Sequence, residues 1–328
     1  MVSNKEFLKY NQQMKLLRDK KGIYCKGSFD KSILFSAGYF NLVNGYKDPF
    51  VSGRDCEDNR IYISGTDIKE LYSLKQFDFE LRMLLFKYIV MIEEDVRTLA
   101  AHRFDECNLN SKYSWFDVAA YDPKSNAQDI VKTISKAYMD VSNSNQEYVK
   151  FYMDEHKVIP TWIMIKVIKF STFIDFLKLS KPEVKNSICL LYGMIDEENK
   201  NKKYQHKILI SSLHLMRVIR NICAHNERLY AYKRSDGRVL TPYFDMMSTG
   251  YMKVRDQKII DLIVFMKYYL PNEEYMYLIE EIKSLLSKLK DKVNPVAFDR
   301  VRGSLGIKDL DHIEKLLLNP KNIEYNKF

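Results

Sequence analysis

The sequence predicts an all-α protein. Two observations lead to this prediction: apolar residues recur at helical spacing over long segments, and the 328 residues include only 11 glycines and 8 prolines. The 46% apolar and 29% charged residues are typical of a folded globular protein with an ample core. We expect an N-terminal helical module (1–65), a helical bundle (66–290) and a short C-terminal helical appendage (291–328).

The N-terminal module begins with a basic amphipathic segment, residues 5–20, that predicts a helix. Its expected buried side consists of Phe7, Leu8, Met14 and Leu17. Residues 29–50 are rich in aromatic side chains, which either stack on nucleic-acid bases or pack the module onto the rest of the protein. Residues 48–65 form a loop, with an extended patch at 60–63 that predicts a short hairpin.

The bundle begins at Thr66, which has the chemistry of a helix N-cap. Residues 71–97 predict two helices with a broad apolar face. Pro160 suits the first turn of a later helix, in which Trp162 is expected to anchor the core. Further helices are expected at 127–140, 147–155, 156–177, from about 204 through the motif described next, 258–270, 274–288 and 307–318.

One stretch of the chain, R-N-I-C-A-H-N-E-R-L-Y at residues 220–230, combines groups that RNA chemistry needs. An arginine binds and stabilises phosphate charge, and a histidine moves protons near neutral pH. On a continuous helix, Asn221 and His225 meet on one face, while Arg220 lies about 140° from His225 and can swing back toward it. The polar stripe of that helix consists of His214, Arg217, Asn221, His225 and Arg228.

The string R-N-I-C-A-H resembles the R-x-x-x-x-H signature of the HEPN superfamily, and the longer string resembles Abi-like abortive-infection proteins of the AbiD/AbiF type. Three other parts of the chain are similar to that family: the aromatic stretch that ends in N-G-Y (29–50), F-D-F-E-L-R with I-E-E-D-V-R (77–97), and the P-T-W segment (156–177). Lys166 and Ser171 depart from the family pattern.

The resemblance implies a HEPN-type helical bundle and a metal-independent RNA endonuclease that acts in phage defence or as a toxin-like factor. It also implies a homodimer with a composite site. In this site His225 handles protons, Arg220 stabilises the charge on phosphorus and Asn221 orients the imidazole or the phosphate. We expect Arg217 and Arg228 to hold RNA. Lys233 and Arg234 either add a basic rim for phosphates or belong to a solvated turn.

Two alternatives remain open. In the first, the same stripe belongs to a non-catalytic RNA-binding module that grips a small noncoding RNA or seals a dimer. In the second, a further R-x-x-x-x-H match, Arg97 to His102, faces Arg220 and His225 within one chain. A structural role explains Arg97 and His102 more simply, because Thr98 replaces the polar amide that follows Arg220.

Composition restricts other functions. The net charge of +9 favours a polyanionic partner, although a basic surface that only aids solubility remains open. Five cysteines, odd in number and without a C-x-x-C pair, indicate reduced thiols of the cytoplasm, and the apolar run at 83–92 is too short to span a membrane. Six histidines without metal-ligand spacing, and no nucleotide-binding fingerprint, predict neither metal nor cofactor.

Overall fold

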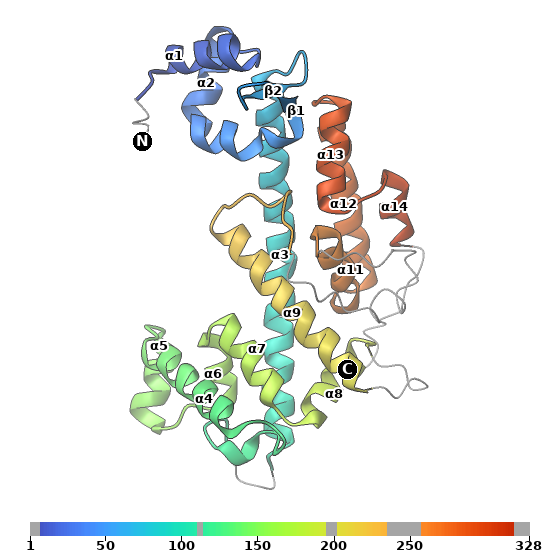
Figure 1. The fold of residues 1–328 in the computed structure, drawn as a ribbon. Coiled ribbons are helices and arrows are strands. Elements are labelled where there is room, and N and C mark those ends of the chain that lie inside the picture. Colours follow the sequence, from blue (N-terminus) through green and yellow to red (C-terminus); the bar gives the residue numbers. More distant parts are fainter. Residues whose placement is uncertain (1–6, 110–113, 195–201, 235–256, 318–328) are drawn as a thin grey trace.

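One long helix organises the computed structural model, which describes residues 7–109, 114–194, 202–234 and 257–317. Helix α3 (Ile68–Glu106) has 39 residues and is about 58 Å long at 1.5 Å per residue. It runs from the N-terminal elements to the opposite end of the molecule (Figure 1). The prediction of two helices here is wrong: no glycine or proline interrupts α3, and buried apolar positions continue to Phe104.

The N-terminus of α3 is a capping box that lies one residue later than predicted. Asp67, and not Thr66, is the N-cap, and its carboxylate accepts a hydrogen bond from the Lys69 N–H at 2.8 Å. Glu70 in turn accepts from the Asp67 N–H at 2.8 Å. Thr66 instead donates its hydroxyl to the carbonyl of Ile63 at 2.7 Å, so it closes the preceding turn.

The N-terminal elements gather around the first turns of α3 (Figure 1). They are α1 (Tyr10–Lys15), η1 (Leu16–Lys20), α2 (Gly27–Ala37), η2 (Phe40–Asn44), η3 (Asp48–Phe50), β1 (Val51–Arg54) and β2 (Arg60–Tyr62). Strands β1 and β2 pair antiparallel and form the expected hairpin. Met14 and Leu17 are buried as predicted, but Phe7 is 88% exposed, because the first helix begins only at Tyr10.

A group of short helices surrounds the other end of α3 (Figure 1). They are η5 (Val118–Ala120), α4 (Ala127–Ser142), α5 (Glu147–Phe151), η6 (Tyr152–His156), α6 (Thr161–Val167), α7 (Phe170–Leu179) and α8 (Pro182–Leu191). The predicted core anchor Trp162 is 55% exposed, so that prediction is wrong. Trp115 is the buried tryptophan, and its indole N–H donates to the carbonyl of Ile159 at 2.7 Å.

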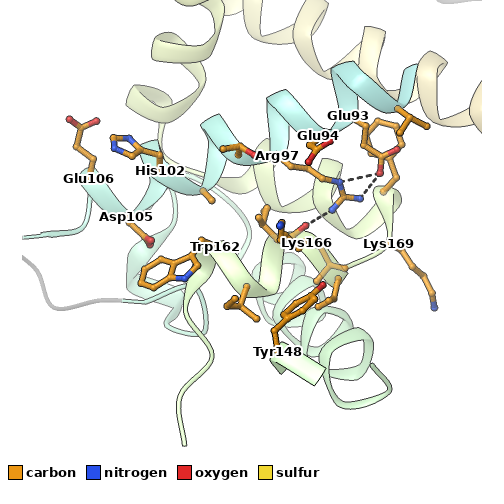
Figure 2. A pocket seen from close by; sticks show the side chains of 18 of the residues that line it. Glu93, Glu94, Arg97, His102, Asp105, Glu106, Tyr148, Trp162, Lys166 and Lys169 are labelled. Atoms are coloured by element: carbon orange, nitrogen blue, oxygen red, sulfur yellow. Dashed lines mark hydrogen bonds and ion pairs between the residues drawn. The ribbon is translucent and has the colours of Figure 1, made fainter. Parts of the chain in front are cut away.

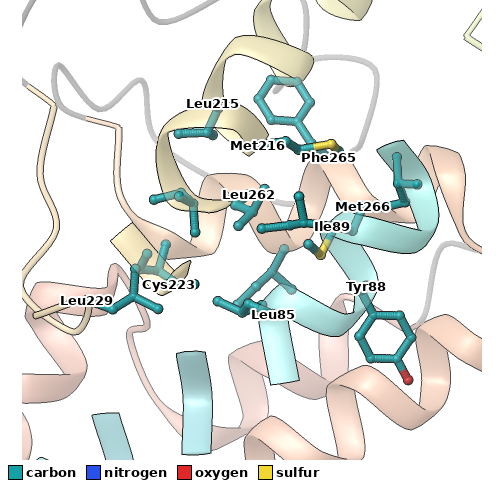
Figure 3. Packing of buried hydrophobic residues seen from close by; sticks show 14 of the residues in the cluster. Leu85, Tyr88, Ile89, Leu215, Met216, Cys223, Leu229, Leu262, Phe265 and Met266 are labelled. Carbon is teal, nitrogen blue, oxygen red and sulfur yellow. The ribbon is translucent and has the colours of Figure 1, made fainter. Parts of the chain in front are cut away.

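Helix α9 (Lys202–Ala224) crosses α3, and α11 (Ile259–Tyr269) packs against both. Every residue of α11 is buried, which explains why its apolar character is not confined to one face. Figure 3 shows this junction, where side chains of all three helices interdigitate. They include Leu85 and Ile89 from α3, Leu215, Met216 and Cys223 from α9, and Leu262, Phe265 and Met266 from α11.

The C-terminal helices return to the N-terminal elements. They are α12 (Asn272–Lys290), α13 (Pro295–Leu305) and α14 (Leu310–Lys315). Arg300 on α13 donates to the carbonyls of Pro49 and Val51 at 2.9 and 2.5 Å. Gly306 ends α13 with a φ of +87°, and a Cβ there would lie 2.5 Å from Ile260. The expected C-terminal appendage is therefore hydrogen-bonded to the expected N-terminal module.

Candidate functional site

The motif helix α9 ends inside the R-N-I-C-A-H-N-E-R-L-Y string, at Ala224. Asn226 adopts a left-handed backbone with a φ of 56°, its N–H donates to Cys223 at 3.2 Å, and the Glu227 N–H donates to Ile222 at 3.0 Å. These two bonds form a Schellman cap with an asparagine where glycine is usual. The N–H of His225 still donates to the Asn221 carbonyl at 2.9 Å, so the predicted helical stripe ends at the exposed His225 and does not include Arg228.

A buried ion pair on α3 holds the chain beyond this cap. The Arg82 guanidinium contacts the Asp78 carboxylate at 2.5 Å, the Asn226 side-chain oxygen at 2.7 Å and the Glu227 carbonyl at 3.0 Å. Asp78 also accepts from the Tyr230 N–H at 2.6 Å. Burial raises the pKa of Asp78, and the Arg82 guanidinium opposes that shift. The turn that carries His225 is thus fixed from α3.

A second carboxylate on α3 orients Arg220. The Nε of Arg220 lies 3.7 Å from Glu93, whose other oxygen accepts two bonds from Arg97 at 2.7 and 3.1 Å. The Arg220 side chain remains 38% exposed, and it donates to the Asn221 side-chain oxygen at 3.4 Å. Glu93 therefore lies between two guanidinium groups. The Arg220 side chain is 38% exposed, whereas the Arg97 side chain is 11% exposed.

The second R-x-x-x-x-H match has a different environment. Arg97 is only 9% exposed, donates to the carbonyl of Ile165 at 2.5 Å and lies 5.0 Å from the centre of the Phe173 ring. Burial lowers its pKa, and Glu93 opposes that shift. His102 is exposed and lies nine residues along α3 from Glu93, about 13 Å away. These contacts support the structural role for Arg97.

The predicted RNA-binding residues occupy four different environments. Arg217 is partly buried on α9, and Lys233 is exposed. Arg228 donates to the Gly45 carbonyl at 2.7 Å and pairs with Asp48 at 3.3 Å, so it ties the motif turn to the N-terminal module. The backbone of Arg234 pairs with Gln257 in an isolated antiparallel bridge.

His214, the first residue of the predicted stripe, is half-buried on α9. Burial and the neighbouring Arg217 lower its pKa. A neutral imidazole is therefore the stable form of His214 at neutral pH.

A groove of about 1260 Å³ lies between α3 and α6 and adjoins Arg220 (Figure 2). Its two ends differ in chemistry. Trp162, His102, Asp105 and Glu106 gather at one end, whereas Lys166, Lys169, Glu93 and Arg97 lie toward the other. His225 does not line this groove. The structure thus places Arg220 beside the groove and His225 outside it, in the turn that follows α9.

A sequence model of the Abi-like protein family matches residues 32–231, more than half of the chain. The chain belongs to the Abi-like protein family. The match covers most of the N-terminal aromatic stretch (from residue 32), all of α3 and the whole motif string. Searches of curated proteins and of solved structures find no match. Membership of this family points to abortive-infection defence.

Three of the strings that resemble Abi-like proteins meet at Asp78. The N-G-Y string supplies Tyr46, whose hydroxyl donates to Asp78 at 2.9 Å. The F-D-F-E-L-R string supplies Asp78 and Arg82 themselves, and the end of the motif string supplies the backbone of Leu229 and Tyr230. In this Abi-like protein these strings therefore mark a structural junction behind the motif turn.

Other chemical features of the described residues are simple. No group of three or more His, Cys, Asp or Glu side chains in the described ranges is arranged to hold a metal ion. No helix in that part of the chain has the length and apolar character needed to cross a membrane. All five cysteines are free, and burial raises the pKa of Cys223, inside the motif, to about 12. Its thiol is protonated at neutral pH and is not a nucleophile.

Sequence reasoning does not find two features of the candidate site of this Abi-like protein. The first is Glu93, which contacts Arg220 across 127 positions of sequence. Its only signal is its place in the I-E-E-D-V-R string. The second is the groove, because Trp162 was assigned to the core. An exposed tryptophan and a buried one have the same apolar signature in a sequence, and burial separates them only in the folded chain.

Proposed function

We propose that this Abi-like protein is a metal-independent RNA endonuclease of bacterial phage defence, of the HEPN type and the AbiD/AbiF group, acting in the cytoplasm. One observation carries the proposal: a partly exposed arginine held by a carboxylate precedes by five positions an exposed histidine at the end of the same helix. A phosphate-binding guanidinium and a proton-transferring imidazole suffice for transesterification within RNA.

In the proposed reaction the 2′-oxygen of a ribose attacks the adjacent phosphorus. His225 accepts the 2′-hydroxyl proton, and Arg220 stabilises the negative charge that grows on the phosphate oxygens. The bond from phosphorus to the 5′-oxygen then breaks, and that oxygen takes a proton from an imidazolium. The products are a 2′,3′-cyclic phosphate and a 5′-hydroxyl. Asn221, hydrogen-bonded to Arg220, orients the guanidinium and the phosphate.

A homodimer completes the proposed site. Within one chain the Arg220 side chain is directed to Glu93 beside the groove, whereas His225 is exposed at the end of α9, outside the groove. Two copies whose α9 ends face each other bring the arginine of one copy to the histidine of the other. In this arrangement Arg217, Lys233 and Arg234 contribute positive charge near the bound RNA, and Arg228 acts by holding the motif turn.

The test measures cleavage of total bacterial RNA by purified protein in EDTA. We expect Arg220→Ala and His225→Ala to lower the rate by about 100-fold or more, as loss of a charge stabiliser or a general base does. Arg54→Ala and His156→Ala are matched controls, because both side chains are exposed outside the motif. Cleavage by His225→Ala at the wild-type rate would remove the proposal.

A mixing experiment tests the composite site. Arg220→Ala and His225→Ala proteins, each inactive alone, are unfolded, mixed and refolded, and a heterodimer then contains one site with both groups intact. We expect a substantial fraction of wild-type activity and a solution mass of two chains. A monomeric mass would contradict the dimer. RNA binding without cleavage by any variant would favour the non-catalytic RNA-binding module.

A further inference from the structure

The groove between α3 and α6 indicates which RNA sequence this protein recognises. That the bound polymer is RNA rests on the proposed function. Its outstanding residue is Trp162, whose large apolar ring is 55% exposed on the lining of the groove. A side chain of this size usually gains more by burial than by exposure. An exposed indole on a concave surface is well suited to stack on a planar ligand.

Asp105 lies at the same end of the groove as Trp162 (Figure 2). The hydroxyl of Thr161, the residue before Trp162, donates to one oxygen of Asp105 at 2.5 Å. This bond joins α3 to the start of α6 and fixes the carboxylate beside the indole. Glu106, the next carboxylate, pairs with Arg103 at 2.6 Å. Burial raises the pKa of Asp105, and the hydrogen bond from Thr161 opposes that shift and favours the ionised form.

An ionised carboxylate only accepts hydrogen bonds, so it selects a ligand edge that donates. Among the RNA bases, guanine presents two adjacent donors, its ring N1–H and its 2-amino group, and these match a carboxylate. Uracil presents one ring donor, and adenine and cytosine present an amino group beside an acceptor. The pair of an exposed indole and a fixed carboxylate therefore suits a stacked guanine.

The rest of the groove suits the strand that carries this base. Lys166 lies four residues after Trp162, on the same face of α6. Lys169, at the start of α7, also lines the groove, but its ammonium group pairs with Asp140 at 3.2 Å. Two carboxylates lie at the Arg220 end: Glu93 is shared by two arginines, and the exposed Glu94 also lines the groove, so Arg220 and Lys166 supply the positive charge that a phosphate needs there. Positively charged side chains at this end suit the phosphates of a nucleotide strand, and the hydrogen-bond acceptor at the other end suits one of its bases.

We propose that this groove binds single-stranded RNA with one unpaired guanine stacked on Trp162 and hydrogen-bonded to Asp105, and with its backbone directed toward Arg220. Asp105 and Glu93 are twelve residues apart on α3, about 18 Å. This distance corresponds to about five nucleotides at the rise of a stacked strand and to fewer in an extended one. Cleavage therefore occurs at a fixed offset of a few nucleotides from a guanine.

Binding is measured first, with RNA that cannot be cut. The probes are ten-nucleotide oligouridines, 2′-O-methylated throughout, that contain one central guanosine, inosine or adenosine. We expect guanosine to bind most tightly and inosine, which lacks the 2-amino donor, about tenfold more weakly. Quenching of tryptophan fluorescence reports contact with Trp162 directly, because Trp115 is buried.

Three variants separate the contributions of the groove. Trp162→Ala should weaken binding of the guanosine probe by about 5- to 150-fold, the range found for one base stacked on an aromatic ring. Trp162→Phe should restore most of the affinity. Asp105→Asn should abolish the preference for guanosine over adenosine. The matched controls, Tyr277→Ala and Asp129→Asn, change exposed residues outside the groove and should bind like wild type.

The outcomes distinguish this inference from the proposed function. Equal affinity for the three probes, or an Asp105→Asn protein that still prefers guanosine, overturns the guanine site even if RNA is cleaved through His225. Conversely, guanosine-selective binding that depends on Trp162 and Asp105 supports the site even if no variant cleaves RNA. Mapped cleavage ends without a constant offset from guanines contradict the path toward Arg220.

Discussion

The buried ion pair between Asp78 and Arg82 offers the sharpest test of how this fold is held together. Asp78→Ala removes a carboxylate that is 0% exposed and accepts bonds from four groups. They are the Arg82 guanidinium, the Tyr46 hydroxyl and the backbone N–H groups of Leu229 and Tyr230. The position is closed to solvent, so each donor that loses its acceptor bears a desolvation cost.

The magnitude follows from what remains after the substitution. Removing one partner of a buried ion pair costs about 3–5 kcal/mol, and each buried donor without an acceptor adds about 1–3 kcal/mol. Arg82 keeps two acceptors, on Asn226 and Glu227, and the protein relaxes around the site, so we expect a net loss of about 4 kcal/mol. For 328 residues this corresponds to a fall of about 6 °C in the melting temperature.

Thermal and urea unfolding of the wild-type and Asp78→Ala proteins measure this loss. Asp78→Asn keeps an acceptor for the backbone N–H groups and should be less destabilised. The double variant Asp78→Leu/Arg82→Met removes both charges and should recover part of the stability. A single Asp78→Ala variant that melts within about 1 °C of wild type would refute the reasoning, because it would mean that water or a rearranged side chain satisfies all of these donors.

Two further predictions concern buried charges elsewhere. Arg97→Ala leaves Glu93 buried with only the distant Arg220 contact, and we expect a loss of about 3 kcal/mol in urea unfolding, whereas a surface arginine such as Arg54 should lose less than about 1 kcal/mol. Burial raises the pKa of Asp261 to about 6, above its ordinary 3.8, so the stability that its protonated form contributes is present below pH 4 and is lost as the pH rises through 6. The Asp261→Asn protein should therefore be more stable than wild type by up to about 3 kcal/mol at pH 7 and equally stable below pH 4. A stability difference that does not change with pH would contradict this prediction.

The sequence allows the helical class and most helices to be predicted, because periodicity and the scarcity of glycine are local signals. Local signals also explain the errors. Thr66 and Asp67 both have N-cap chemistry, and only the fold shows that Thr66 is used by the preceding turn. The stripe through Arg228 requires that helical spacing continues past Asn226. Asparagine adopts a left-handed backbone more readily than most residues, but Arg82, which holds Asn226 in this turn, is 144 positions away in the sequence.

The candidate site could be predicted as residues but not as geometry. The motif string names Arg220 and His225, yet the groups that position them belong to α3 and are found only in space. The strings that resemble the family contain the same residues that make the supporting contacts. The strings most similar to Abi-like proteins contain Asp78, Arg82 and Glu93, which organise the motif turn and Arg220, so a family pattern can mark supporting residues as strongly as reacting ones.

The end of α9 is set from α3 at two points. Arg82 fixes the turn after His225 through Asn226, and Glu93 fixes the Arg220 side chain. Arg82 and Glu93 are eleven positions apart on one unbroken helix, about 16 Å, so one rigid element contacts both Arg220 and the turn after His225. Arg220 lines the groove between α3 and α6, so RNA in that groove reaches Arg220 from the side of α3. His225 is exposed in the turn outside the groove, where a second copy of the chain can contact it.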